Sequence, residues 1–231
     1  MSTAKSENEA REQRILDAAS DLIVHYGFDK TTVSDIAREA GISKGAIYLH
    51  FDSKDALFES LLIREMQAYT ERWFDLIEKD EYGGTIGSMY KNTLYALNAS
   101  EFMAAVFKQD SRVMGSYVRK PDNFFRQQQE HDTRFAFVKM MQDAGVIRQD
   151  MDARVIAHIM DMLAYGLVSM DEVKKEEHIP PTDDIIEGIA TIMDAALTPP
   201  DADKEAGIAI LHQIISAAKL QMQQQNETNE E

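Results

Sequence analysis

Apolar residues recur every three or four positions along most of the chain, which is the period of a helix with one buried face. Strict alternation of apolar and polar residues, the mark of a half-buried strand, is scarce. None of the prolines interrupts a helical stretch, and Gly83-Gly84 and Gly145 likewise fall between stretches. The prolines stand at positions 121, 180, 181, 199 and 200. The pattern predicts an all-α fold.

The first helix is predicted over residues 9–26, where Gly27 ends it. Two short helices follow, with Thr32 and Ser43 placed as their N-caps, and a long helix begins at 53 and continues to 79. Further helices are predicted over 85–99, 101–117, 122–144, 152–173, 183–197 and 203–223.

These helices suggest three parts. Residues 9–52 are expected to form a helix-turn-helix domain, 53–79 a connecting helix, and 80–223 a larger helical domain. Residues 1–8 and 224–231 are polar and are expected to be disordered.

The two short helices, joined by residues 40–42, have the spacing of a helix-turn-helix. Gly41 stands where the tight turn needs a positive φ, and Ala37 is small where the two helices meet. The second helix of such a unit offers its N-terminal, solvent-facing side to the major groove of DNA. On that side lie Ser43, Lys44, Gly45, Ala46, Tyr48 and His50.

The charge of the chain argues against a nucleic-acid partner, because its formal net charge is −16. No Asp or Glu occurs between Ala40 and Phe51, however, and several cations lie close by in sequence. They are Lys30, Arg38, Lys44 and Lys54. Since the Debye length at physiological salt is about 8 Å, distant carboxylates are largely screened from this segment. For DNA binding, the local lack of carboxylates and the nearby cations therefore matter more than the net charge of the whole chain.

From about Arg14 to Leu62 the chain resembles the TetR family of transcription regulators. The matching segments are ILDAA at 15–19, YGF at 26–28, TTVSDIA at 31–37, AGISKGAIY at 40–48, HF at 50–51 and SKDAL at 53–57. The resemblance implies a homodimer in which each subunit places its second short helix in one half of a palindromic operator. It also implies that the larger domain binds a small effector and forms the dimer.

Carried over by position, the resemblance makes Thr32, Tyr48, His50 and Lys54 phosphate contacts. Ser43, Lys44, Gly45 and Ala46 would then lie nearest the bases. Thr32 has an alternative role as a helix cap, and it can serve both purposes. Tyr48 has an alternative place on the core of the domain.

The second domain is rich in aromatic and methionine side chains, which suit a cavity for an apolar or aromatic ligand but more often form plain core. The candidate effector-binding residues are Trp73, Tyr95, Phe102, Phe107, Phe125, Met141, His158, Asp161, Met162 and Tyr165. His158 and Asp161 stand three positions apart on one helix. They either satisfy each other or anchor a polar group of the effector.

The last predicted helix carries an apolar side that is broad for a lone surface helix, formed by Ile208, Leu211, Ile215 and Ala218. We expect this side to build an isologous four-helix dimer interface with either 152–173 or 183–197.

Other classes of function find little support. The chain has no cysteine, its histidines lack metal-ligand spacing, and no phosphate loop or nucleophile motif occurs, so no metal, cofactor or catalytic residue is predicted. No apolar run approaches the length of a membrane span, and the first residues lack the apolar core of a signal peptide. We therefore expect a soluble cytoplasmic protein.

The sequence favours a ligand-responsive dimeric repressor that a small, largely apolar or aromatic effector releases from DNA. One alternative is a DNA-binding regulator that a protein partner controls or that has no small effector. Another is an all-α enzyme with an incidental helix-turn-helix.

Overall fold

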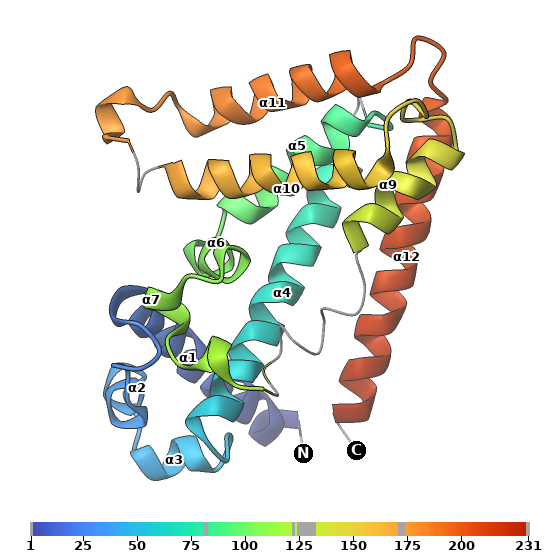
Figure 1. Cartoon of the computed structure of the whole chain (residues 1–231). Coiled ribbons are helices and arrows are strands. Elements are labelled where there is room, and N and C mark those ends of the chain that lie inside the picture. The colour runs from blue at the N-terminus through green and yellow to red at the C-terminus, as the bar shows by residue number, and fades with distance from the viewer. Residues whose placement is uncertain (1, 81–82, 122, 124–132, 171–173, 230–231) are drawn as a thin grey trace. The chain divides into compact units, whose positions relative to one another are not determined.

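The computed structural model describes residues 2–80, 83–121, 123, 133–170 and 174–229, and Figure 1 shows the arrangement of its helices. Across these residues the chain forms helices, turns and loops without a strand, so the predicted all-α fold is confirmed. No helix in this part of the chain combines the length and the apolarity that crossing a membrane requires.

The first four helices lie close to their predicted positions. They are α1 (Ser2–Tyr26), α2 (Val33–Glu39), α3 (Lys44–Tyr48) and α4 (Lys54–Glu78). α1 begins seven residues earlier than the predicted start at 9, inside the stretch expected to be disordered. That stretch contains Ala, Lys and Glu, which are good helix formers, so a polar composition does not prevent the helix from continuing.

The later helices are α5 (Ile86–Asn98), α6 (Glu101–Lys108), α7 (Ser111–Met114), the 3-10 turn η1 (Tyr117–Arg119), α9 (Thr133–Asp143), α10 (Ala153–Ser169), the 3-10 turn η3 (Glu176–His178), α11 (Thr182–Leu197) and α12 (Lys204–Asn229). α12 extends past residue 224, where disorder was expected.

The single helix predicted over 101–117 is wrong, because the chain breaks it twice. Gln109 adopts a left-handed conformation with φ of 49° and ends α6. Asp110 then caps α7 by accepting a hydrogen bond from the Arg112 backbone N–H at 2.8 Å. Gly115, with φ of 55°, ends α7 in turn.

The helices group into two compact units. The N-terminal unit comprises the described residues of Met1–Ala68 and Ser100–Glu130, and the C-terminal unit those of Tyr69–Ala99 and His131–Glu231. This grouping differs from the expected division, because the unit boundary falls within α4. In addition, α6, α7 and η1 join the helix-turn-helix instead of the second domain.

An aromatic cluster accounts for that grouping in the N-terminal unit. The fully buried ring of Phe58 in α4 lies 4.8 Å from Phe28, 4.7 Å from Tyr117 and 6.0 Å from Phe102, measured between ring centroids. Asp29, which follows Phe28, accepts a hydrogen bond from the Ser116 backbone N–H at 3.0 Å. The Ser116 hydrogen bonds hold the pKa of Asp29 below its usual value. The segment from α6 to η1 is thus part of the core beneath the helix-turn-helix.

The C-terminal unit is built on the close packing of α5 along α11. A Cβ added at Gly87 would lie 2.4 Å from the Ala190 carbonyl oxygen, so only glycine permits this approach. Asp194 of α11 accepts hydrogen bonds from the Gly87 backbone N–H at 2.7 Å and the Thr85 hydroxyl at 2.9 Å. This carboxylate therefore satisfies donors at the start of α5 that the helix itself leaves unpaired.

Replacing that carboxylate tests its contribution to the fold. We expect Asp194→Ala to lower the free energy of unfolding by about 2 kcal/mol, because it leaves partly buried donors without an acceptor. Urea denaturation monitored by circular dichroism measures the change. Asp201→Ala removes an exposed carboxylate from the loop after α11 and is the matched control. Equal midpoints for the two variants would contradict the assigned role.

Candidate nucleic-acid interface and ligand cavity

Thr32 begins α2 with the predicted capping box. Its hydroxyl oxygen accepts a hydrogen bond from the Asp35 backbone N–H at 3.2 Å, and the Asp35 carboxylate accepts one from the Thr32 backbone N–H at 3.2 Å. The hydrogen bond from the Thr32 hydroxyl is the main reason that the pKa of Asp35 lies below its usual value. Thr32 therefore acts as a cap, and its side chain remains at the exposed surface.

The turn between α2 and α3 has the predicted geometry. Gly41 adopts a positive φ of 67°, and the Ile42 N–H donates to the Ala37 carbonyl oxygen at 2.9 Å. Ile36, Ala37 and Ile47 are buried between the helices. These apolar contacts fix the direction in which α3 presents its outer side.

The outer side of α3 is exposed and lacks carboxylates. Ser43 caps the helix, with its hydroxyl oxygen accepting from the Ala46 N–H at 3.1 Å, and Lys44 and Gly45 are exposed. Tyr48 is 46% exposed, so its alternative place in the core does not apply, and the Lys44 Nζ lies 5.9 Å from its ring centroid. The structure thus brings Lys44 and Tyr48 together on one surface.

Leu49 is a candidate contact that the sequence analysis missed. Its side chain is 83% exposed at the end of α3, beside Tyr48. An apolar residue in an apolar segment is expected to be buried, so no signal in the sequence distinguished it. An exposed apolar side chain at a DNA surface can contact a thymine methyl group.

Two of the predicted phosphate contacts point inward. The His50 side chain is only 3% exposed, and its Nδ1 lies 3.7 Å from Glu12 Oε2 in α1. The Lys54 ammonium donates to the Phe28 carbonyl oxygen and lies 4.0 Å from the centroid of the Phe28 ring. Burial lowers the pKa of Lys54. The structure contradicts the prediction for both residues, because contacts with distant segments occupy their polar groups.

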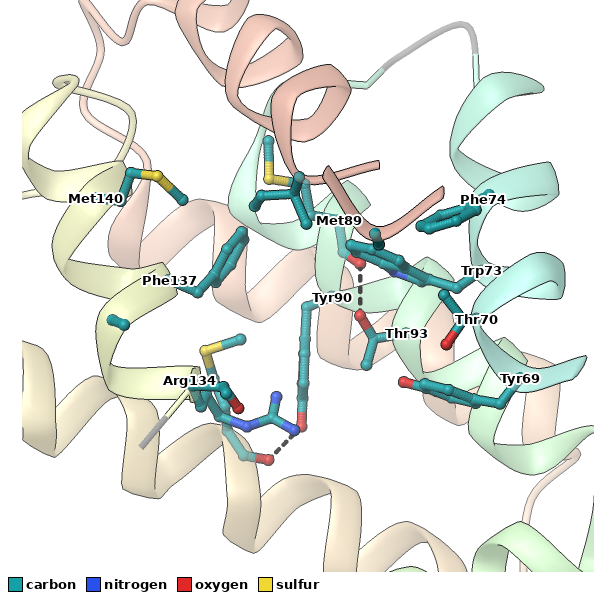
Figure 2. A pocket seen from close by; sticks show the side chains of 15 residues that line it. Tyr69, Thr70, Trp73, Phe74, Met89, Tyr90, Thr93, Arg134, Phe137 and Met140 are labelled. Atoms are coloured by element: carbon teal, nitrogen blue, oxygen red, sulfur yellow. Dashed lines mark hydrogen bonds between the residues drawn. The ribbon is translucent and has the colours of Figure 1, made fainter. Parts of the chain in front are cut away.

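The C-terminal unit contains a cavity of about 560 Å³. In Figure 2, Phe137 and Met140 of α9 face Trp73 of α4 across it, with Tyr90 of α5 between them. The lining residues are Tyr69, Thr70, Trp73, Phe74, Met89, Tyr90, Thr93, Thr133, Arg134, Ala136, Phe137, Met140, Met160, Ile214 and Ala218. A volume of this size suits a small organic ligand.

Of the nine predicted effector-binding residues that the structure describes, only Trp73 lines this cavity. Phe102 and Met141 are buried in the cores of their units, and Phe107 is half-buried in the N-terminal unit. The Tyr95 hydroxyl contacts Glu187 Oε1 at 3.3 Å, and Phe125 lies outside the described residues.

The predicted residues on α10 do not line the cavity either. His158, Met162 and Tyr165 are exposed, and Asp161 pairs with Arg134 instead of His158. Residue type and the spacing of His158 and Asp161 suggested these side chains, but neither revealed which side of α10 the other helices cover. The signal that the prediction could have used is Arg134, a cation among aromatic residues near the start of a helix.

The polar groups at the cavity are few and mostly paired. Arg134 Nε lies 2.6 Å from Asp161 Oδ1. The Tyr90 hydroxyl donates to the Met160 carbonyl oxygen, and a dashed line at Tyr90 marks this hydrogen bond in Figure 2. Burial raises the pKa values of Tyr69 and Tyr90, so both hydroxyls stay protonated. Trp73 Nε1 is buried and has no hydrogen-bond partner among the described residues. Within those residues no group of three potential metal ligands occurs.

The predicted dimer surface on α12 is mostly covered by the subunit itself. Leu211 and Ile215 are buried in the C-terminal unit and Ala218 lines the cavity, while only Ile208 is exposed. This prediction is therefore wrong for the centre of the surface, because the broad apolar side of α12 packs inside its own unit. Exposed apolar side chains occur instead on α10 and α11. They are Val155, Ile159, Met162, Tyr165 and Ile192.

Comparison with known proteins agrees with this architecture. Residues 15–61 match the family of bacterial regulatory proteins, tetR family. The HTH-type transcriptional repressor Rv1474c of Mycobacterium tuberculosis is 28% identical over 165 residues, covering 69% of this chain and 81% of that protein. The HTH-type transcriptional repressor KstR2 of Rhodococcus jostii is 25% identical over 181 residues, covering 72% of this chain and 86% of that protein.

Among solved structures, the transcriptional regulator FadR from Bacillus subtilis in complex with stearoyl-CoA has a similar fold. Its TM-score is 0.58 at 19% identity, with 78% of this chain and 96% of that chain covered. Residues 15–61 thus match the DNA-binding segment of the tetR family, and over its wider length the chain is similar to TetR-family transcriptional regulators in sequence and in all-helical fold.

Proposed function

We propose that the protein is a repressor that binds a palindromic operator as a homodimer and leaves it when a small effector binds. The observation that carries the proposal is the exposed side of α3, which has Lys44 and Tyr48 on one surface and no carboxylate. The curated relatives named above are repressors, which supports the same direction of control. The proposal assigns no catalytic role to any residue.

In this proposal α3 enters the major groove of DNA. Ser43, Gly45 and Ala46 are small and permit close approach to the bases, while Lys44 reaches a base edge or a phosphate. Thr32 and Tyr48 contact phosphates on either side of the groove. Leu49 contacts a sugar or a thymine methyl group beside them.

The net charge of −16 weakens non-specific attraction to DNA but leaves this surface usable. Screening at physiological salt limits the reach of carboxylates elsewhere to about 8 Å. Affinity for the operator should fall as salt rises, because each phosphate contact releases counterions.

We place the dimer interface on α10 and α11. Met162 and Ile192, at 62% and 67% exposed, are large apolar side chains that a second copy of the chain would cover. On α10, Val155, Ile159 and Met162 follow one another at helical spacing. Since α10 also packs against α11, two copies of this pair would form an isologous four-helix interface.

The effector is proposed to occupy the cavity of the C-terminal unit. FadR was crystallised with stearoyl-CoA, which supports ligand control in a protein of this fold. A ligand that prefers one conformation of the dimer lowers operator affinity by its difference in affinity for the two conformations. The alternative is control by a protein partner without a small effector, and thermal melting shifts with a panel of ligands would distinguish the two.

The DNA surface is tested by two substitutions. We expect Lys44→Ala and Tyr48→Ala each to weaken operator binding by about tenfold or more, because each removes one contact to DNA. Fluorescence anisotropy measures the affinity, with DNA that the unchanged protein selects from a random-sequence pool. Lys204→Ala removes an exposed lysine from α12 and is the control for net charge. Unchanged affinity in both variants, with normal helical content, would remove the assigned surface.

The dimer interface is tested by adding charge to it. We expect Met162→Glu combined with Ile192→Glu to give monomers, because four buried carboxylates would face one another or apolar side chains across the interface. Light scattering coupled to size exclusion measures the mass. Leu220→Glu alters an apolar residue on α12 that is 56% exposed and should leave the dimer intact. A dimer that survives the paired substitution would refute the placement.

A further inference from the structure

The charge of the cavity lining is unlike that of the chain. The protein has 40 Asp and Glu residues against 24 Lys and Arg, yet none of the described residues that line the cavity is acidic. Arg134 is the one charged residue among them. The remaining walls are aromatic, aliphatic, methionine and threonine side chains. The lining therefore opposes a cationic ligand and favours a neutral or negatively charged one.

Arg134 is held by a partner that does not itself line the cavity. Its side chain is 22% exposed, and its Nε contacts Asp161 Oδ1 at 2.6 Å across the packing of α9 on α10. A guanidinium presents five N–H donors in a planar fork that suits a carboxylate in two-point contact. The Asp161 carboxylate is about half exposed, so water can solvate it if it leaves the pair.

A second feature, the buried indole N–H of Trp73, indicates that the cavity binds a ligand or water. Trp73 Nε1 is buried without an acceptor among the described residues, although buried donors are normally paired. Trp73 also forms one wall of the cavity, opposite Phe137 (Figure 2). An oxygen atom of a bound ligand or a water molecule beside it would satisfy this donor.

We propose that the effector is an apolar organic anion whose carboxylate replaces Asp161 as the ion-pair partner of Arg134. The proposal rests on the proposed function, because it names the chemical class of the effector assigned to this cavity. The apolar body of the anion would lie between Trp73 and Phe137. Asp161, once released, changes the charge on α10, directly beside Met162 of the proposed dimer interface. Ligand binding and dimer geometry would thus be coupled through adjacent residues of one helix.

Trp73 is the only tryptophan in the chain, so its fluorescence reports directly on the cavity. The test uses the full-length protein without DNA and three probes that share one apolar body: phenylbutyrate, phenylbutanol and phenylbutylamine. We expect phenylbutyrate to change the emission saturably and to bind at least about tenfold tighter than the alcohol, with the amine weakest. Equal or tighter binding of the alcohol or the amine would overturn the proposal. The absence of a saturable response to millimolar phenylbutyrate would overturn it as well.

Two substitutions test whether Arg134 recognises the ligand or only forms a structural ion pair with Asp161. Arg134→Gln should abolish the preference for phenylbutyrate over phenylbutanol. Asp161→Asn should strengthen phenylbutyrate binding several-fold, because the competing carboxylate is gone, whereas loss of a merely structural ion pair would weaken binding or leave it unchanged. If Arg134→Gln does not fold, as judged by circular dichroism, Asp161→Asn decides the question alone.

Operator binding without any probe is measured separately by fluorescence anisotropy. If the protein binds its operator but shows no preference for the anion, the present inference fails and the proposed regulator remains. If the preference for the anion is found but no operator can be selected, the assignment of the ligand class stands and the proposed regulator fails.

Discussion

The packing around Phe58 is the interaction on which the DNA-binding surface depends. This single ring of α4 contacts aromatic rings from the loop after α1, from α6 and from η1. Aromatic pairs at such distances stabilise a core beyond the area that they bury. Because α2 packs on α1 and α3 on α2, the direction of α3 follows from how firmly α1 is held. The helix-turn-helix is therefore positioned partly by α6 and η1, whose rings Phe102 and Tyr117 lie more than fifty positions beyond α3 in the sequence.

The distribution of charge follows a single physical rule in both units. Among the described residues no Asp or Glu is buried, so the carboxylates lie at least partly at the surface. The exposed side of α3 and the lining of the cavity lack carboxylates, and each contains a cation, Lys44 in one and Arg134 in the other. Both surfaces thus suit negatively charged partners. For α3 this partner is the DNA backbone, and for the cavity it is the proposed organic anion.

α10 is the element at which the two proposed activities of the C-terminal unit meet. Met160 lines the cavity and its carbonyl oxygen accepts the Tyr90 hydroxyl, while Ile159 and Met162 are exposed. Successive residues of a helix point in different directions, so one short stretch faces both the ligand and the proposed partner subunit. In the proposed dimer both sides of α10 would be packed, so a shift at the cavity would also displace the side that contacts the partner subunit.

The sequence by itself determined the features that depend on neighbouring residues: the helical period, the capping box of Thr32 and Asp35, and the Gly41 turn. It also determined most of the exposed surface of α3, because that surface is set by one short helix and its cap. Tertiary structure decided which apolar sides face a cavity, a core or solvent. The helical period is the same in α10 and α12, yet Met162 is exposed and Leu211 is buried. His50 contacts Glu12, and Lys54 contacts Phe28. These partners are distant in sequence, so no local pattern could have predicted the contacts.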